Sequence, residues 1–210
     1  VFNPVTDPIK AKLVQSLESS GNNLTGIKVG AYQPEKLNLL LEQNPEIKKV
    51  GVIYRKGDPS SGPEVAELEI IANQMNLELK KIEINSVVEL PEAAKKIVEE
   101  IDAFYSPNDG TVSSGIDFII HYVNQKNLPM VAPTLTGVER GALLYIGPNY
   151  EETGKKAGEL AAKIFQGANP SNLPIEFPSR LWIGVNLKNA KKTNLPIAES
   201  ILDKADYKIY

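Results

Sequence analysis

Polar side chains that could bind a small ligand gather in three short segments, each directly after an apolar run. The first segment is YRKGDPSSGPEV (54–65). It begins at Tyr54 and carries Asp58, Ser60 and Ser61 just ahead of a helical pattern. A carboxylate and two hydroxyls at the start of a helix can accept hydrogen bonds from a polar solute, and the hydroxyls can also donate hydrogen bonds to it.

The second and third segments repeat this arrangement further along the chain. SPNDGTVSS (106–114) places Asp109, Gly110 and Thr111 between the apolar run AFY and the run IDFIIHYV. VAPTLTGVERG (131–141) places Thr134 after another apolar run. In open parallel sheets, ligands bind beyond the carboxyl ends of the strands, where loop amides and helix N-termini converge. These three segments are therefore the candidate binding loops.

A zwitterionic amino acid would find suitable partners in such loops. Hydroxyls and free helix amides can bind its carboxylate, and Asp109 can pair with its ammonium. Ordinary helix capping is the alternative, because Ser, Thr and Asp are favoured at helix starts whether or not a ligand binds. For Ser60 and Ser61 taken alone, capping is the favoured interpretation.

Composition and motifs exclude several other classes of function. The 210 residues carry 23 basic and 26 acidic side chains, so no basic patch predicts nucleic-acid binding. There is no cysteine and a single histidine, His121, within a helical pattern, so we expect no metal site and no Ser-His-Asp triad. No G-x-G-x-x-G or G-x-x-x-x-G-K-[ST] motif occurs, and we expect no cofactor.

The elements that would position these loops alternate along the chain. Apolar, β-branched runs at 48–54, 77–84, 102–106, 128–133 and 142–147 predict strands. Patterns with apolar residues at i, i+3 and i+4 predict helices over 62–75, 90–101 and 113–126, between successive strands. This alternation predicts an α/β fold with a doubly wound parallel sheet.

The remaining segments predict a second, partial lobe. A helix is expected over 150–167, with Asn149 as its N-cap and Gly167 after its C-terminus, and another over 9–19. We expect one nearly complete lobe over 34–178, with 1–26 and 187–204 as parts of the other lobe. Residues 27–33 and 179–186 would then be hinge crossovers between the two lobes, as in hinge-closing binding proteins.

The order of several motifs resembles a known family. TDP (6–8), NLTG (23–26), VIY…DPSS (52–61), DAFYSPNDGTVSS (102–114), VERGAL (138–143) and VNLKNAKK (185–192) are similar to motifs of substrate-binding proteins of a bacterial ABC transporter family, sometimes described as tryptophan/tyrosine-type. The resemblance runs over essentially the whole chain. It implies a type I periplasmic-binding-protein fold, no enzymatic activity, and an aromatic amino acid as ligand.

The resemblance also implies partners, a location and ligand contacts. The protein would be a monomer, periplasmic or lipid-anchored outside the cell membrane, and would deliver its solute to an ABC permease. The matching motifs imply contacts from Asp58, Ser60, Ser61, Asp109, Gly110 and Thr111, with Thr6 and Asp7 from the first lobe. Gly110 stands where family members often have Asn. Family members also carry an export signal and most of the first lobe ahead of TDP, so we expect further sequence upstream of Val1.

Other functions stay open at this point. The ligand could instead be a branched-chain amino acid, a sugar or a nucleoside. The chain could also be the ligand-sensing domain of a larger receptor. A hinge-closing enzyme with Asp109 as general base is a further alternative, but the sequence shows no partner nucleophile for it.

Overall fold

The computed structural model describes residues 1–210, and the chain forms two compact units. The large unit comprises Tyr32–Gly147 and Trp182–Tyr210. The small unit comprises Val1–Ala31 and Pro148–Leu181. The chain therefore passes between the two units three times, at residues 31–32, 147–148 and 181–182.

The large unit is built on one seven-stranded sheet with strand order β4-β3-β5-β6-β7-β8-β9. The first five of these strands are parallel to one another, as the doubly wound prediction requires. The backbone N–H of Asn186 donates to the Leu143 carbonyl, which places the end of β8 beside the start of β7 and makes this pair antiparallel. The strands are β3 (Lys49–Arg55), β4 (Glu78–Ile84), β5 (Ala103–Tyr105), β6 (Met130–Ala132), β7 (Leu144–Pro148), β8 (Leu181–Asn186) and β9 (Tyr207–Ile209).

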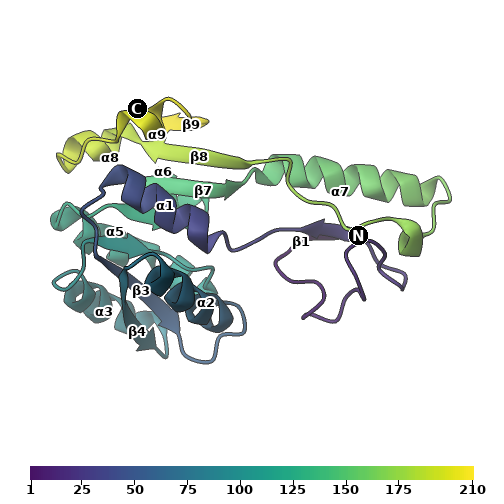
Figure 1. Ribbon diagram of the computed structural model, residues 1–210, viewed down its shortest axis with the longest axis horizontal. Helices are drawn as coiled ribbons and strands as arrows, with labels where there is room; N and C mark the ends of the chain where they lie inside the picture. Colours follow the sequence, from purple (N-terminus) through teal and green to yellow (C-terminus); the bar gives the residue numbers. More distant parts are fainter. The chain divides into compact units, whose positions relative to one another are not determined.

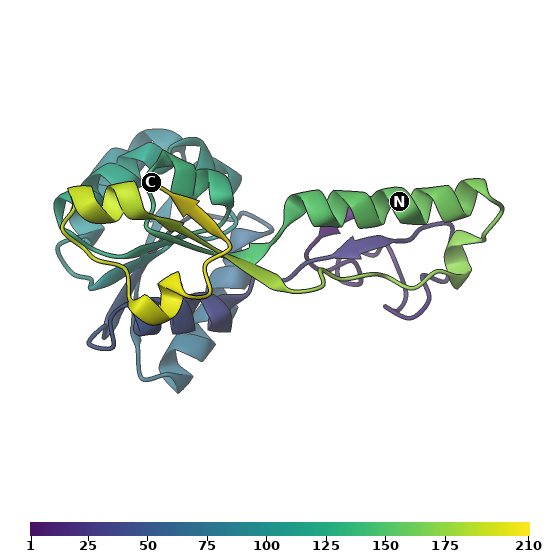
Figure 2. The same cartoon turned by 90° about the horizontal axis from the view of Figure 1, so that it is seen from above.

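Helices cover both faces of this sheet, and each face has its own apolar core (Figures 1 and 2). One face carries α1 (Gln33–Gln43), α2 (Ser61–Gln74) and α9 (Glu199–Leu202). The other carries a 3-10 turn (Val87–Glu89), α3 (Leu90–Ile97), α4 (Gly110–Ser114), α5 (Ile116–Gln125) and α6 (Leu135–Arg140). A further helix, α8 (Leu187–Lys192), follows β8 directly. The predicted α/β class and doubly wound sheet are confirmed.

The small unit contains two parallel strands and the longest helix. The strands are β1 (Phe2–Val5) and β2 (Gly26–Lys28), and helix α7 (Tyr150–Phe165) contacts both. A 3-10 turn (Pro170–Asn172) follows, and the chain then runs beside β2, where Lys28 N–H donates to the Glu176 carbonyl. The Asn149 side chain caps α7, as predicted, by accepting hydrogen bonds from the amides of Glu151 and Glu152.

No helix in the chain combines the length and the apolar character that crossing a bilayer requires.

The predicted helix over 9–19 does not form. The segment is a series of turns, in which Lys12 N–H donates to the Ile9 carbonyl and Leu13 N–H to the Pro8 carbonyl. Lys12 has φ = 58°, a left-handed conformation that ends any right-handed helix at that residue. Only Val14 of this segment is fully buried, so packing does not stabilise a helical conformation.

The structure draws the unit boundaries differently from the sequence prediction. Residues 187–204, expected beside the N-terminal segment, pack in the large unit: Gln43 on α1 donates to the Pro196 carbonyl at 2.8 Å and accepts from Ala198 N–H at 3.1 Å. Residues 148–178, expected in the large lobe, belong to the small unit, where α7 packs on β1 and β2. The expected hinge crossovers 27–33 and 179–186 contain two of the three passages, and the third falls at 147–148.

Candidate functional site

Strands β3 and β5 are parallel neighbours at the centre of the large unit, and their following helices lie on opposite faces of the sheet. The chain leaves β3 for α2 and leaves β5 for α4. Such a switch point opens a crevice beyond the carboxyl ends of the strands, where doubly wound proteins bind ligands. Six of the predicted site residues lie in the two loops at this point: Asp58, Ser60, Ser61, Asp109, Gly110 and Thr111.

The Asp109 carboxylate joins the two loops. Its Oδ1 accepts hydrogen bonds from the backbone amides of Thr111 at 2.9 Å and Val112 at 3.1 Å, which caps α4. Its Oδ2 accepts from the Arg55 amide at 2.7 Å and from the Ser61 hydroxyl at 2.6 Å. Asp109 is 1% exposed and Ser61 is fully buried. One carboxylate therefore holds the end of β3, the start of α2 and the start of α4 together.

This geometry changes the role expected for Asp109. A carboxylate that accepts four hydrogen bonds from its own chain has no free position for a ligand ammonium, and burial keeps the ammonium away. The Ser61 hydroxyl donates its proton to Asp109, and Ser61 is fully buried. Asp109 therefore acts as the cap of α4, as the capping alternative predicts, and together with Ser61 it also links the two loops.

Asp58 caps α2 from the other loop. Its Oδ1 accepts from the amides of Ser60 at 2.9 Å and Ser61 at 2.8 Å, and its Oδ2 lies 3.5 Å from an Arg55 guanidinium nitrogen. Partial burial would raise the pKa of Asp58, but hydrogen bonds from the Ser61 and Ser60 amides, with the Arg55 charge, outweigh it and lower that pKa. Asp58 thus stays ionised.

Three donors at the switch point remain free of partners in the chain. The hydroxyls of Ser60 and Thr111 make no hydrogen bond, and neither does the Gly110 amide. Ser60 is exposed and Thr111 is half-buried, and a Cβ on Gly110 would meet nothing within 4 Å. Two hydroxyls and an amide on one rim can bind a carboxylate.

A buried charged cluster lies directly behind these loops. The Glu64 carboxylate on α2 accepts a hydrogen bond from the Tyr105 hydroxyl at 2.6 Å, and its Oε1 lies 3.7 Å from the Lys36 ammonium on α1. Lys36 Nζ also donates to the Tyr105 oxygen at 3.3 Å and sits 4.8 Å from the centre of that ring. All three side chains are at most 5% exposed. The pairing offsets the cost of burying each charge.

Burial fixes the protonation states within this cluster. Burial, then the adjacent Glu64 charge, raises the pKa of Tyr105 well above its usual value, so Tyr105 stays a hydrogen-bond donor. Burial lowers the pKa of Lys36, and the attraction of Glu64 opposes that change. Glu64 also reaches the binding loop, because its Oε2 accepts from both the backbone amide and the side-chain amide of Asn108, each at 3.0 Å.

Sequence reasoning missed this cluster, although the sequence carries a signal for it. Lys36 lies one residue before Leu37 and four before Leu40, and Glu64 lies one before Val65 and four before Leu68. Each charge thus occupies the apolar face of its helix, where an unpaired charge would be too costly. A basic and an acidic residue placed in this way predict a buried pair.

Two other predicted residues of the large unit lie outside this arrangement. The Tyr54 hydroxyl donates to Glu83 on β4 at 3.0 Å, and burial, then Glu83, raises the pKa of Tyr54 to about 12. Thr134 stands at the start of α6, after β6, without capping it through its side chain. The structure places neither in the Asp58 and Asp109 hydrogen-bond network.

Thr6 and Asp7 belong to the small unit. Thr6 is exposed, and Asp7 accepts from the Lys10 amide at 2.9 Å. That hydrogen bond and the Lys10 charge outweigh partial burial and lower the pKa of Asp7. The part of these two residues in ligand binding stays a prediction of the family resemblance.

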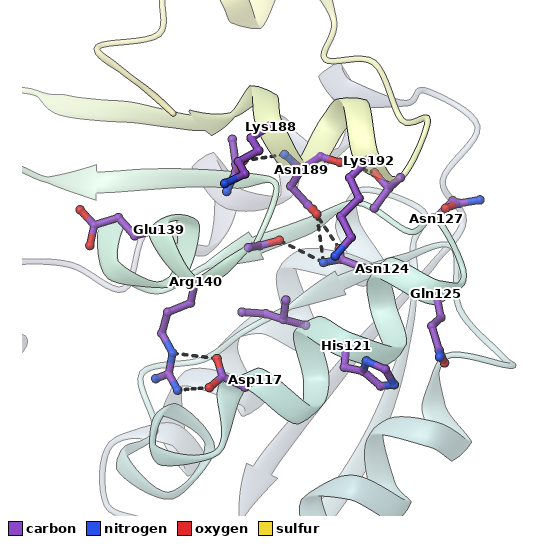
Figure 3. A pocket seen from close by; sticks show the side chains of 14 residues that line it. Asp117, His121, Asn124, Gln125, Asn127, Glu139, Arg140, Lys188, Asn189 and Lys192 are labelled. Carbon is purple, nitrogen blue, oxygen red and sulfur yellow. Dashed lines mark hydrogen bonds and ion pairs between the residues drawn. The ribbon is translucent and has the colours of Figure 1, made fainter. Parts of the chain in front are cut away.

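A cavity of about 630 Å³ lies elsewhere in the large unit, between α5, α6 and α8 (Figure 3). Its floor holds a reciprocal amide pair, in which Asn124 and Asn189 donate to each other at 3.2 and 3.0 Å. His121 lines it from α5, within a helix as the sequence predicted, and its side chain is exposed. No predicted site residue lines this cavity, and no cluster of three or more His, Asp or Glu side chains could hold a metal ion anywhere in the chain.

Comparison with known proteins agrees with the fold and identifies the family. The model of the family described as ABC transporter substrate binding protein matches residues 1–209. A tyrosine-binding protein of Clostridioides difficile (strain R20291) is 33% identical over 195 residues, which are 93% of this chain and 56% of that protein. The chain spans little more than half the length of the curated relatives it matches.

Solved structures resemble the chain over nearly all of its length. An ABC domain from Streptococcus pneumonia in complex with L-Trp is 25% identical, with a TM-score of 0.85 over 98% of this chain and 72% of that one. A ligand-free, open substrate-binding protein with adhesive properties from Clostridium difficile is 27% identical, with a TM-score of 0.82 over 99% of this chain and 70% of that one. The chain therefore belongs to the family described as ABC transporter substrate binding protein, which is a family of binding proteins and not of enzymes.

Proposed function

We propose that this protein binds an aromatic amino acid at the loops that follow β3 and β5, as the solute-binding component of an ABC importer. The observation that carries the proposal is the switch point itself. Asp109 and Asp58 fix the two loops, and the free hydroxyls of Ser60 and Thr111 and the Gly110 amide remain on the rim as donors for a ligand carboxylate.

The relatives support the class of ligand. One relative is named for tyrosine binding, and a solved relative holds L-Trp. Both ligands share an ammonium, a carboxylate and an aromatic ring, so a binding site for either needs donors for the carboxylate and an acceptor for the ammonium. Branched-chain amino acids share only the polar half, and sugars or nucleosides share neither charge.

The proposed location and partner follow from family membership. A substrate-binding component works outside the cytoplasm and delivers its ligand to a membrane permease, so we infer both for this protein. A lipid anchor, a monomeric state, and ligand contacts from Thr6 and Asp7 belong to the same proposal. Further, we infer that the large unit is the complete lobe of the binding protein and that the small unit belongs to the other lobe.

Identification of the retained solute tests this proposal without prior choice of ligand. The full-length protein would be purified under native conditions, denatured, and its released small molecules measured by mass spectrometry. We expect tyrosine, tryptophan or phenylalanine in amounts approaching one per protein. A sugar, a nucleoside or a branched-chain amino acid in that amount would instead support one of the alternative ligands.

A further inference from the structure

Asn108 lies in the loop after β5, immediately before Asp109, and its side-chain amide has a fixed orientation. The Nδ2 group donates to Glu64 Oε2 at 3.0 Å, and the Asn108 backbone amide donates to the same oxygen at 3.0 Å. An ionised carboxylate only accepts hydrogen bonds, so the amide cannot turn its oxygen towards Glu64. The side-chain oxygen, Oδ1, therefore points away from Glu64.

That oxygen has no partner within the chain. Asn108 is half-buried, and its Oδ1 accepts no hydrogen bond from the protein. The neighbouring Asp109 carboxylate, by contrast, accepts four. Of the two neighbouring side chains Asn108 and Asp109, only Asn108 thus keeps an unpaired acceptor oxygen for a ligand.

The group that orients Asn108 is itself held rigidly. Glu64 is 5% exposed, and its other oxygen accepts from Tyr105 at 2.6 Å and faces the Lys36 ammonium at 3.7 Å. Lys36 is 2% exposed and balances the charge of Glu64. In a water-poor interior, hydrogen bonds in a chain polarise one another, so donation to Glu64 increases the negative partial charge on Asn108 Oδ1.

We propose that Asn108 is a specificity-determining residue that accepts a hydrogen bond from the ligand ammonium, and that Glu64, held by Lys36 and Tyr105, is the residue that positions it. This inference rests on the proposed function, because it assigns the ammonium subsite of an amino-acid ligand. It replaces Asp109 in that role. A neutral acceptor with a fixed direction favours a ligand that presents an N–H donor at this point over one that lacks it.

The test is a double-mutant cycle in the full-length protein, with Asn108→Ala, Glu64→Gln and the combination. Binding of L-tyrosine, or L-tryptophan if the wild type prefers it, would be measured by calorimetry. Binding of the matching analogue without the amine, 3-(4-hydroxyphenyl)propanoate or indole-3-propanoate, would be measured by competition. Asn38→Ala, an exposed asparagine on α1 without a side-chain hydrogen bond, is the matched control.

We expect Asn108→Ala to weaken amino-acid binding by roughly 10- to 100-fold, the range for a hydrogen bond to a charged group, and to leave the analogue within about twofold. Glu64→Gln lets the Asn108 amide turn over and should weaken the amino acid selectively, by a smaller factor. The combined variant should bind no more weakly than Asn108→Ala alone, because Glu64 acts through Asn108. Equal losses for both ligands in Asn108→Ala would overturn the ammonium contact of Asn108, and additive losses in the combined variant would overturn the positioning role of Glu64.

Two further measurements keep the outcome decisive. If Glu64→Gln unfolds because Lys36 is left unpaired, Lys36→Met/Glu64→Gln removes both charges and takes its place in the cycle.

Nuclear magnetic resonance should show slowed solvent exchange of the Asn108 side-chain N–H in the wild type, with or without ligand, and fast exchange in the Glu64 variant. Fast exchange in the wild type would contradict the fixed orientation.

The inference and the proposed function fail in different ways. If the wild type binds an aromatic amino acid and Asn108→Ala binds it equally well, only the inference is overturned. If the wild type binds no aromatic amino acid, the proposed function is overturned, and the ammonium subsite with it.

Discussion

The Ser61 hydroxyl donates a hydrogen bond to the Asp109 carboxylate across 2.6 Å, and this contact joins the helix after β3 to the turn after β5. The same carboxylate oxygen accepts from the Arg55 amide at 2.7 Å, at the last residue of β3. Both loops of the switch point are thus fixed by one buried side chain. The shape of the two candidate binding loops therefore depends on Asp109, which is buried and accepts four hydrogen bonds from its own chain.

Asp109→Asn should destabilise the protein. The substitution places an NH₂ group opposite the Arg55 amide or removes the cap of α4, and either change leaves a buried donor unpaired. We expect the free energy of unfolding in urea to fall by about 1–3 kcal/mol. Asp203→Asn, at an exposed aspartate without a side-chain hydrogen bond, should change it by less than about 0.5 kcal/mol. Equal stability of the two variants would contradict the structural role of Asp109.

Asp58 should contribute stability that depends on pH. Its pKa in the folded protein is lowered below the ordinary value of 3.8, so ionised Asp58 stabilises the fold above pH 3.8. That contribution is lost as the pH falls through the lowered pKa. The free energy of unfolding of the wild type should therefore exceed that of Asp58→Asn above pH 3.8, and the difference should shrink in more acidic solution. A difference that grows as the pH falls would have the wrong sign.

The buried Lys36 and Glu64 should be strongly coupled. Lys36→Met leaves the Glu64 charge buried without its counter-charge, and we expect a loss of about 3–5 kcal/mol in the free energy of unfolding. Lys36→Met/Glu64→Gln removes both charges and should recover most of that loss. If the combined variant is less stable than Lys36→Met alone, the two side chains do not form the pair described above.

The C-terminal segment should stabilise the large unit. Ile201 on α9 is fully buried in the core that also contains Leu37 and Leu40 of α1. Ile201→Ala should lower the free energy of unfolding by about 2–5 kcal/mol. Ile70→Ala, at a 60% exposed isoleucine on α2, is the matched control and should cost less than about 1 kcal/mol. Similar effects of both substitutions would place Ile201 outside the core.

The central sheet could be predicted from the sequence because its strands carry the information locally. The runs at 48–54 and 142–147 are apolar and β-branched, and each became a strand of the sheet. The starts of helices α2 and α7 carry their own signals. Pro63 lies in the first turn of α2, and the Asn149 side chain caps α7. These features act within a few residues of each other, so no tertiary contact is needed to recognise them.

The boundaries between units could not be predicted in the same way. Whether α7 joins the small unit depends on contacts with β1 and β2, which are separated from it by more than a hundred residues. Helix α1 was also missed, because Lys36 interrupts its apolar face and only burial beside Glu64 makes that lysine compatible with the core. Contacts between segments far apart in the sequence decide both the unit that α7 joins and the formation of α1.

The candidate site shows the same division between local and long-range information. Asp58 and Asp109 could be found from their loops, because turn chemistry is local. The Asp109 carboxylate also accepts hydrogen bonds from Arg55 and Ser61 only because β3 and β5 are adjacent, so the sequence could not distinguish a ligand contact of Asp109 from a structural bridge. Asn108 could not be singled out from the sequence because its orientation depends on Glu64, which lies 44 residues away.

Calorimetric titration of the full-length protein decides whether it binds an aromatic amino acid. L-tyrosine, L-tryptophan and L-phenylalanine would be titrated in parallel with L-leucine and D-ribose. We expect saturable binding of one ligand per protein for at least one aromatic amino acid, roughly tenfold or more tighter than for L-leucine, a difference of about 1.4 kcal/mol. Tighter binding of L-leucine or D-ribose than of all three aromatic amino acids would contradict this expectation.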